Sequence, residues 1–288
     1  MYLDFYNLNE FPFSLGCDAR FFYESAVHAE ALANMQYTIE QRKGMVLVTG
    51  EVGAGKTFLG TVLADRLGVG TLTVMMNHPP QSSKQLLRAM ANKAGLTVPD
   101  RADRLALVDE LEQYLVRLHR RGRVAALLVD EAQDLPTQAL EELRLLWNWE
   151  REGQRLVQIV LIGQPELRDR VQEPRWEPLR QRIVLSYHLG HLSLKDTTAY
   201  IAHRLQVASG GRCLADFTDE ALRTIHEAAD GIPRLVNVLC DNSLLTAYAK
   251  GVYRIYTDIV SEVLGNMTCW NMGTLHPAAS RGTPPGTD

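Results

Sequence analysis

The hydrophobic residues divide the chain into a first part that alternates strands with helices and a second part that is helical. Five apolar runs fall in the first part: Met45–Thr49, Thr71–Met76, Val124–Val129, Val157–Ile162 and Ile183–Tyr187. Because successive residues in each run are apolar, the runs predict strands buried on both faces, as in a parallel sheet covered by helices. Apolar residues at helical spacing predict helices between them, over Phe58–Leu67, Lys84–Ala94, Leu105–Arg120 and Leu140–Trp149.

The second part begins after about Gly190, where the strand signals end. Its predicted helices are Leu194–Ser209, Asp219–Ala229, Ile232–Ala249 and Asp258–Leu264. Residues 269–288 are rich in Pro, Gly, Ser and Thr and have little to bury, so a disordered tail is expected there. We therefore expect a larger α/β domain over residues 41–190 and a small all-helical domain over residues 191–268.

Composition is that of an ordinary soluble globular protein, with 46% hydrophobic and 22% charged residues among 288. The formal net charge of -4 gives no support to a nucleic-acid binder that is basic overall. The four cysteines form no CxxC pair, which disfavours a zinc site and favours a reducing cytoplasm. Polar residues interrupt the opening segment, and no apolar run approaches the roughly 20 residues that span a bilayer. We expect a cytoplasmic protein that reaches a membrane only through partners.

A glycine-rich loop follows the first predicted strand and precedes the helix Phe58–Leu67, which is the context of a phosphate-binding loop. Its glycines let the backbone turn sharply and bring N–H groups close to phosphate oxygens. The helix N-terminus adds free N–H groups and a positive dipole end. Lys56 should reach the β- and γ-phosphates, and the Thr57 hydroxyl should ligate Mg²⁺. The predicted nucleotide contacts of the loop are Gly50, Glu51, Val52, Gly53, Ala54, Gly55, Lys56, Thr57 and Phe58.

The alternative for this loop is a glycine-rich turn that matches by chance, which the flanking strand and helix disfavour. Two acids, Asp130 and Glu131, follow the run Val124–Val129 and should emerge at the carboxyl edge of the sheet, where the loop also opens. There Asp130 can hold Mg²⁺, largely through water, and Glu131 can polarise the water that attacks the γ-phosphate. An acidic turn that caps a helix is the alternative for this pair.

Three further polar positions fit the same chemistry. Gln164 follows the fourth predicted strand and can orient water or sense the γ-phosphate, although an ordinary turn is the alternative there. Arg182 precedes the fifth strand and can act on a neighbouring subunit's nucleotide as an arginine finger, with Arg180 as the second choice. A solvated basic surface is the alternative for both arginines. Arg234 lies in the first turn of a predicted helix, from which it can bind the γ-phosphate and couple the helical domain to the nucleotide.

Together these motifs resemble an AAA+ ATPase. One predicted strand separates the glycine loop from the acidic pair, as in the additional-strand class of P-loop ATPases, in which the acid after the Mg²⁺ aspartate is the catalytic base. More narrowly, residues 1–265 are similar to the general secretion pathway protein A family. The matching segments are Met1–Leu3, Phe5–Tyr6, Pro12–Ser14, Asp18–Tyr23, Gly50–Thr57, Asp130–Gln133, Gly163–Leu167, Leu179–Ile183 and Gly231–Arg234.

The resemblance implies a five-stranded parallel sheet between helices, followed by a helical lid, with ATP and Mg²⁺ at the subunit interfaces of a homo-oligomer. It also implies that an N-terminal segment, residues 1–40, packs on the nucleotide site, with Phe21, Phe22 and His28 near adenine. Longer members of the family carry a transmembrane segment and a peptidoglycan-binding domain after the ATPase. Because this sequence ends in a polar tail, we expect a stand-alone ATPase without direct membrane insertion.

Three functions share these motifs. The first is an oligomeric ATPase that powers or regulates a membrane-associated secretion, pilus or export assembly through partner proteins at the inner membrane. The second is an ATP-dependent DNA-binding regulator of the transposition type, which the net charge and the lack of a helix-turn-helix disfavour. The third is a nucleotide-gated binding module with negligible turnover, against which Glu131 argues. The basic residues that support the second are Arg117, His119, Arg120, Arg121, Arg123 and the arginines around Arg175.

Overall fold

The structure, a computed structural model, describes residues 2–268, and the predicted tail lies outside the described residues. The chain forms two compact units. One spans Gly16–Gly190, and the other combines the segment that ends at Leu15 with the chain from His191 onward. The segment 1–40 therefore contributes to both units, and its packing on a nucleotide stays a prediction.

The first unit is built on a five-stranded parallel sheet in the order β2-β3-β6-β1-β7, which confirms the predicted fold class. The three inner strands are buried along their whole length because each has a strand on both sides and helices on both faces. The edge strand β7 is partly exposed. The strands are β1 (Met45–Gly50), β2 (Thr71–Met76), β3 (Val124–Val129), β6 (Val157–Gly163) and β7 (Ile183–Leu189).

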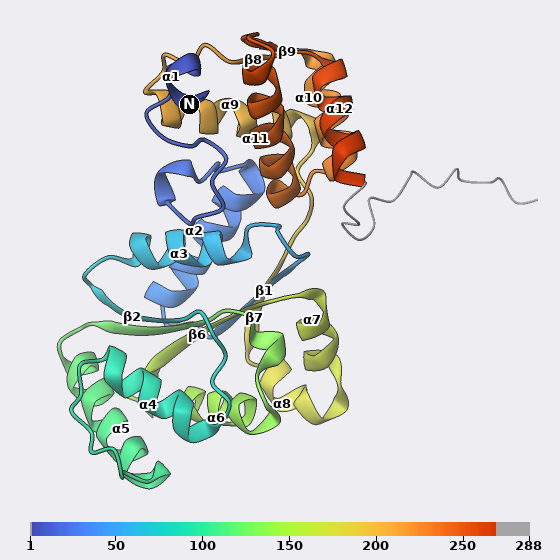
Figure 1. Ribbon diagram of the computed structural model, residues 1–288. Coiled ribbons are helices and arrows are strands. Elements are labelled where there is room, and N and C mark those ends of the chain that lie inside the picture. The colour runs from blue at the N-terminus through green and yellow to red at the C-terminus, as the bar shows by residue number, and fades with distance from the viewer. Residues whose placement is uncertain (1, 269–288) are drawn as a thin grey trace, which may run out of the picture. The chain divides into compact units, whose positions relative to one another are not determined.

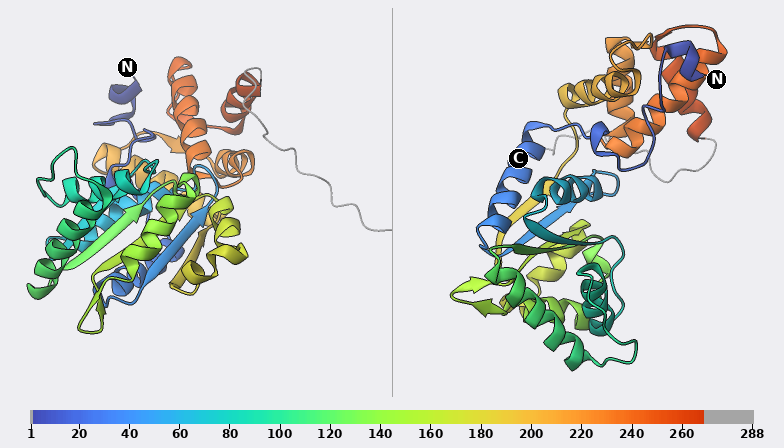
Figure 2. Two further views of the ribbon diagram at one scale, coloured as in Figure 1. Left: turned by 90° about the horizontal axis from the view of Figure 1, so that it is seen from below. Right: turned by 90° about the vertical axis from the view of Figure 1, so that its left-hand side faces the viewer.

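Helices cover both faces of this sheet (Figures 1 and 2). α2 (Ala26–Glu40) and α3 (Lys56–Leu67) pack on one face through a core that includes Leu32, Leu63 and Val160. Five helices pack on the other face, where each fully buried leucine contributes about 1.5–3 kcal/mol. They are α4 (Ser83–Lys93), α5 (Arg104–Arg120), α6 (Thr137–Trp147), α7 (Pro165–Gln172) and α8 (Glu177–Arg180).

The segment after α6 differs from the prediction. The helix ends at Trp147, two residues before the predicted end, and a short antiparallel hairpin follows. Its strands are β4 (Glu150–Arg151) and β5 (Gln154–Arg155), and its turn residues Glu152 and Gly153 both have positive φ, 52° and 74°. Two-residue strands are too short for a period-2 pattern, so only the Glu-Gly pair signals the turn.

The second unit is largely helical, as predicted, with a two-residue parallel pair that the sequence analysis missed. Thr218 accepts a hydrogen bond from the N–H of Ala221 and so caps α10. None of the helices within residues 2–268 is long and apolar enough to cross a membrane. The elements are α1 (Tyr2–Tyr6), α9 (Leu194–Ser209), β8 (Asp216–Phe217), α10 (Asp219–Ala229), α11 (Pro233–Ala249), β9 (Arg254–Ile255) and α12 (Thr257–Thr268).

The N-terminal residues are anchored in this second unit by a buried arginine. The Arg204 side chain is 2% exposed, and it donates hydrogen bonds to the carbonyls of Pro12 (2.5 Å) and Ser14 (2.9 Å). The Tyr6 hydroxyl donates to the Leu244 carbonyl at 3.1 Å. These bonds join residues 6–14 to helices that lie 190 or more residues later in the chain.

Candidate nucleotide site

The glycine loop connects β1 to α3, and its backbone requires glycine at two positions. Gly53 and Gly55 have φ values of 84° and 91°, which residues with a Cβ rarely adopt. Gly55 is the residue before α3, and nothing lies within 4 Å of where its Cβ would be, so the loop leaves open space there. The first N–H groups of α3, from Lys56 onward, have no acceptor within the helix. These features fit a phosphate group.

Lys56 lies over the loop and is 6% exposed. Its ammonium donates to the carbonyls of Gly50 (2.8 Å) and Glu51 (2.9 Å). Burial lowers the pKa of Lys56, while the nearby carboxylates, Glu131 and Asp130 foremost, oppose that shift. The carbonyls and carboxylates therefore hold a cation beside the loop, where phosphate oxygens would be recognised.

Thr57 and Asp130 bring two oxygen donors together. The Thr57 hydroxyl donates to Asp130 Oδ2 at 2.6 Å, and Asp130 is 2% exposed at the end of β3. Burial raises the pKa of Asp130, although the bonds from Thr57 and from the Glu131 N–H oppose that shift. Within residues 2–268 no three His, Cys, Asp or Glu side chains gather as a metal site. Two oxygen donors nevertheless fit Mg²⁺, which keeps several waters and is otherwise held by substrate phosphates.

Glu131 follows Asp130 and has a left-handed backbone, with φ 51° and ψ 37°. Such a conformation is uncommon for a residue with a side chain and is often found at functional sites. Glu131 Oε2 accepts a hydrogen bond from Gln133 Nε2 at 2.7 Å. Gln133 Oε1 accepts the backbone N–H of Gln164 at 3.0 Å. The sequence analysis missed Gln133, although it is the fourth residue of the acidic motif.

Gln164 lies where predicted, between β6 and the first helical residue of α7, Pro165. An aromatic cluster lies beside the first turn of α3, where the Phe22 ring is 5.3 Å from that of Phe58 and 5.3 Å from that of His28. Phe21 is 2% exposed and so belongs to the core. The structure therefore brings Phe22, His28 and Phe58 together next to the glycine loop.

Arg182 lies at the amino ends of the strands, whereas the glycine loop lies at their carboxyl ends. Its carbonyl accepts the N–H of Met45 at the start of β1, whereas the loop follows the end of β1. Six residues at about 3.3 Å each separate the two edges by nearly 20 Å. Arg182 is therefore not part of the glycine-loop site of its own chain.

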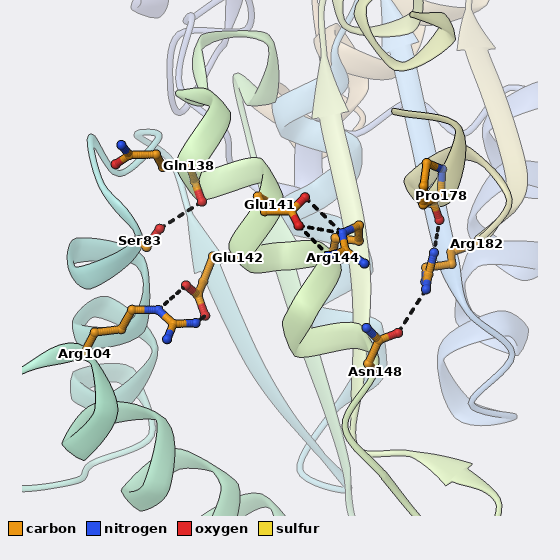
Figure 3. A network of polar contacts seen from close by, with 9 residues as sticks. All are labelled: Ser83, Arg104, Gln138, Glu141, Glu142, Arg144, Asn148, Pro178 and Arg182. Atoms are coloured by element: carbon orange, nitrogen blue, oxygen red, sulfur yellow. Dashed lines mark hydrogen bonds and ion pairs between the residues drawn. The ribbon is translucent and has the colours of Figure 1, made fainter. Parts of the chain in front are cut away.

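The Arg182 guanidinium is held by the end of α6 and the segment before β7 (Figure 3). It donates to Asn148 Oδ1 at 3.1 Å and to the Pro178 carbonyl, and it lies 5.1 Å from the Trp147 ring centroid. Burial lowers the pKa of Arg182, and the positive charges of Arg144 and Arg155 add to that effect. Within the described residues no ion pair of Arg182 is found.

The two remaining predicted residues are exposed. Arg180 is the last residue of α8 and donates to the Gln172 carbonyl at 3.2 Å. Arg234 lies in the first turn of α11, which belongs to the second compact unit. Its contact with a nucleotide stays a prediction.

Known relatives match most of the chain. A family model described as AAA domain matches residues 39–171. General secretion pathway protein A of Aeromonas hydrophila is 40% identical over 255 residues, which are 88% of this chain and 46% of that protein. An uncharacterised HTH-type transcriptional regulator of Methanocaldococcus jannaschii is 25% identical over 214 residues, 73% of this chain and 51% of that protein. The chain thus spans about half the length of these curated relatives.

Solved structures share the fold. The ORC2 protein of Aeropyrum pernix, in ADPNP–ADP complexes, has a TM-score of 0.66 at 17% identity, covering 89% of this chain and 71% of that one. Cdc6p from Pyrobaculum aerophilum gives 0.62 at 17% identity, with 83% and 68% covered. A Thermotoga maritima RuvB structure gives 0.58 at 18% identity, with 85% and 70% covered. The chain belongs to the AAA+ P-loop NTPases, in the group that includes general secretion pathway protein A.

Proposed function

We propose that this protein is a Mg²⁺-dependent ATPase that works as a homo-oligomer and drives or regulates a secretion, pilus or export assembly. The observation that carries the ATPase is the pairing of a buried Lys56 on the glycine loop with the bonded pair Thr57 and Asp130, 2.6 Å apart at the same edge of the sheet. The similarity to a general secretion pathway protein supports the process.

Each residue has a separate task in this proposal. The glycine loop and the N-terminus of α3 receive the phosphates, and Lys56 binds the β- and γ-phosphates. Thr57 and Asp130 hold Mg²⁺, which when bound offsets negative charge on the phosphates. Glu131 orients and polarises the attacking water, and Gln164 senses the γ-phosphate. Phe22, with Phe58 and His28, offers an aromatic face to adenine.

A test of the ATPase compares Glu131→Gln with the wild-type protein and with Glu110→Gln, which neutralises an exposed carboxylate on α5. Glu131→Gln should keep affinity for a fluorescent ATP analogue and lose at least about 100-fold in turnover, because general-base catalysis contributes 10²–10⁴-fold. Glu110→Gln should behave as wild type. Near-normal turnover of Glu131→Gln would remove this carboxylate as the base.

We also propose that Arg182 acts in trans. Its distance from its own glycine loop and its lack of an ion pair within the described residues leave its charge available to a neighbouring subunit. Arg180, which is exposed on the same segment, is the second choice. Arg234 would link the helical unit to the γ-phosphate, so that nucleotide state changes the lid. We place the protein in the cytoplasm, at the inner membrane only through its partners.

A DNA-binding regulator is the second candidate. Arg117 and Arg120 of α5 and Arg151 of β4 line one hollow of about 520 Å³, although Asp109 and Glu112 share it. Binding of ATP-saturated Glu131→Gln protein to labelled duplex DNA across a salt series separates the two functions. ATP-dependent binding that weakens steeply with salt would favour the regulator, because phosphate contacts release counterions. No binding at low salt would favour the secretion or pilus assembly.

A further inference from the structure

Gln133 connects the acidic loop to the junction between β6 and α7. Its side-chain nitrogen donates to Glu131 Oε2 at 2.7 Å and, more weakly, to Asp134 Oδ2 at 3.3 Å. Its side-chain oxygen accepts the backbone N–H of Gln164 at 3.0 Å. One amide therefore contacts both the carboxylate and the backbone of the residue that we propose to sense the γ-phosphate.

The orientation of this amide is fixed by what it contacts. A carboxylate only accepts hydrogen bonds, and a backbone N–H only donates them. A flipped amide would set its oxygen against Glu131 and its NH₂ group against the Gln164 N–H, and both bonds would be lost. Glutamine is thus suited to this position because it carries a donor and an acceptor on one rigid plane.

The amide is also closely packed. A Cβ added at Gly163 would lie 2.7 Å from Gln133 Oε1 and 2.8 Å from Leu167 Cδ2, so the side chain rests directly against the backbone at the end of β6. Arg170 of α7 donates to the carbonyls of Gln133 (3.0 Å) and Leu135 (2.5 Å). Both the side chain and the backbone of Gln133 are therefore bonded to the β6–α7 region.

Glu131 needs such a support, because its left-handed backbone persists only when surrounding contacts hold it. We propose that Gln133 is a positioning residue for Glu131: its bond to one carboxylate oxygen fixes the plane of the carboxylate and leaves the other oxygen for the water. Because the same amide holds the Gln164 N–H, a shift at that junction moves the carboxylate. This inference rests on the proposed ATPase function.

The first experiment measures ATP turnover and nucleotide affinity for Gln133→Ala and Gln133→Glu. We expect kcat to fall about 10- to 100-fold in both, because a misplacement of about 1 Å can cost 10²-fold, while KM and the Kd of a fluorescent ATP analogue stay within about twofold. The matched control is Gln138→Ala, which removes an exposed glutamine side chain five residues later, drawn in Figure 3. A general loss of folding would change the affinities as well.

The second experiment needs no turnover. Hydrogen exchange of the Gln164 amide should accelerate in Gln133→Ala, which removes its acceptor. It should stay protected in Gln133→Glu, which keeps an acceptor oxygen but loses the donor to Glu131 and adds a repelling charge. Loss of turnover with retained protection in Gln133→Glu would separate the two bonds of the amide.

The outcomes distinguish this inference from the proposed function. If Glu131→Gln is inactive while Gln133→Ala has wild-type kcat and unchanged Gln164 exchange, Gln133 has no positioning role and the ATPase assignment stands. If Glu131→Gln keeps normal turnover, the proposed function itself fails. A fall in kcat with unchanged KM, together with faster Gln164 exchange in Gln133→Ala, is the expected result.

Discussion

Replacing Arg204 with methionine should unfold the second compact unit at lower denaturant without affecting the sheet. The guanidinium donates to the carbonyls of Pro12 (2.5 Å) and Ser14 (2.9 Å) and to the Tyr200 hydroxyl (2.8 Å). Hydrogen bonds from a charged donor contribute about 1.5–3 kcal/mol each. Not all of this is lost, because methionine avoids burying a cation, which costs several kcal/mol.

The loss of stability depends on whether water can reach the oxygens that lose the arginine. Ser14 is exposed, so water can replace the lost donor, whereas Pro12 is buried and Tyr200 is 7% exposed. Two buried acceptors left without this donor cost about 1–3 kcal/mol each, which predicts a net destabilisation of about 2–4 kcal/mol. With an m-value of about 1–1.5 kcal/mol/M for a unit of this size, the urea midpoint should fall by about 2 M.

Two optical signals can separate the units. Trp147, Trp149 and Trp176 belong to the sheet-containing unit, so their fluorescence reports on that unit, whereas far-UV circular dichroism also follows the helices of the other. The fourth tryptophan, Trp270, lies outside the described residues and is replaced by phenylalanine in every protein compared. The variant should show an early circular dichroism transition and an unchanged fluorescence transition.

Arg223→Met is the matched control, because it removes an exposed arginine from α10. It should change the free energy of unfolding by less than about 0.5 kcal/mol. Arg204→Lys keeps the charge but cannot reach several oxygens at once, so its effect should lie between those of wild type and Arg204→Met. Coincident, unshifted transitions in Arg204→Met would refute the reasoning that these bonds anchor the N-terminal residues.

Four further perturbations test other parts of the structure. Lys56→Ala should abolish binding of a fluorescent ATP analogue, and retained affinity would remove the phosphate loop assignment. Asp130→Asn should lose Mg²⁺-dependent turnover yet raise the Tm of the nucleotide-free protein. Burial raises the pKa of Asp130 in the folded state, so its charged form opposes folding as pH rises through that pKa, and the neutral amide removes this penalty. Arg182→Ala should lose turnover, and mixing it with Lys56→Ala subunits should restore part of it; no recovery in mixed oligomers of normal size would contradict action in trans. Arg104→Ala should destabilise the sheet-containing unit by about 2–3 kcal/mol in urea unfolding, because it leaves the buried carboxylate of Glu142 without its partner. That carboxylate is 3% exposed and accepts bonds from Arg104 at 2.8 and 2.9 Å (Figure 3). Arg101→Ala, which removes an exposed arginine nearby, should have little effect.

The sequence predicted elements whose signals are local. β3 has the predicted bounds, because six successive apolar residues are typical of a strand buried on both faces. The glycine loop and the acidic pair lie at one edge because parallel strands end together. Residues that act through distant partners were not predictable in this way.

Gln133 illustrates the second class. Nothing in its local sequence indicates that its acceptor would meet the N–H of Gln164, 31 positions later, because that contact exists only after β3 and β6 pair. The contacts of residues 2–15 were not predictable for the same reason. An arginine in a helical pattern is normally assigned to an exposed face, whereas Arg204 is buried. The hydrophobic pattern predicts the order of helices and strands, whereas these contacts form only when distant segments of the chain pack together.

The anchoring of the N-terminal residues has a consequence for how the protein is made. Tyr2 bonds Asp241 and Tyr6 bonds Leu244, so these two tyrosines find their partners only after about 240 further residues have been synthesised. The sheet-containing unit has all its residues once Gly190 has been made. During translation Tyr2 and Tyr6 therefore stay without these partners, while the sheet-containing unit can already fold. A chain released before Asp241 is made would contain Arg204 but lack the hydroxyl partners of Tyr2 and Tyr6.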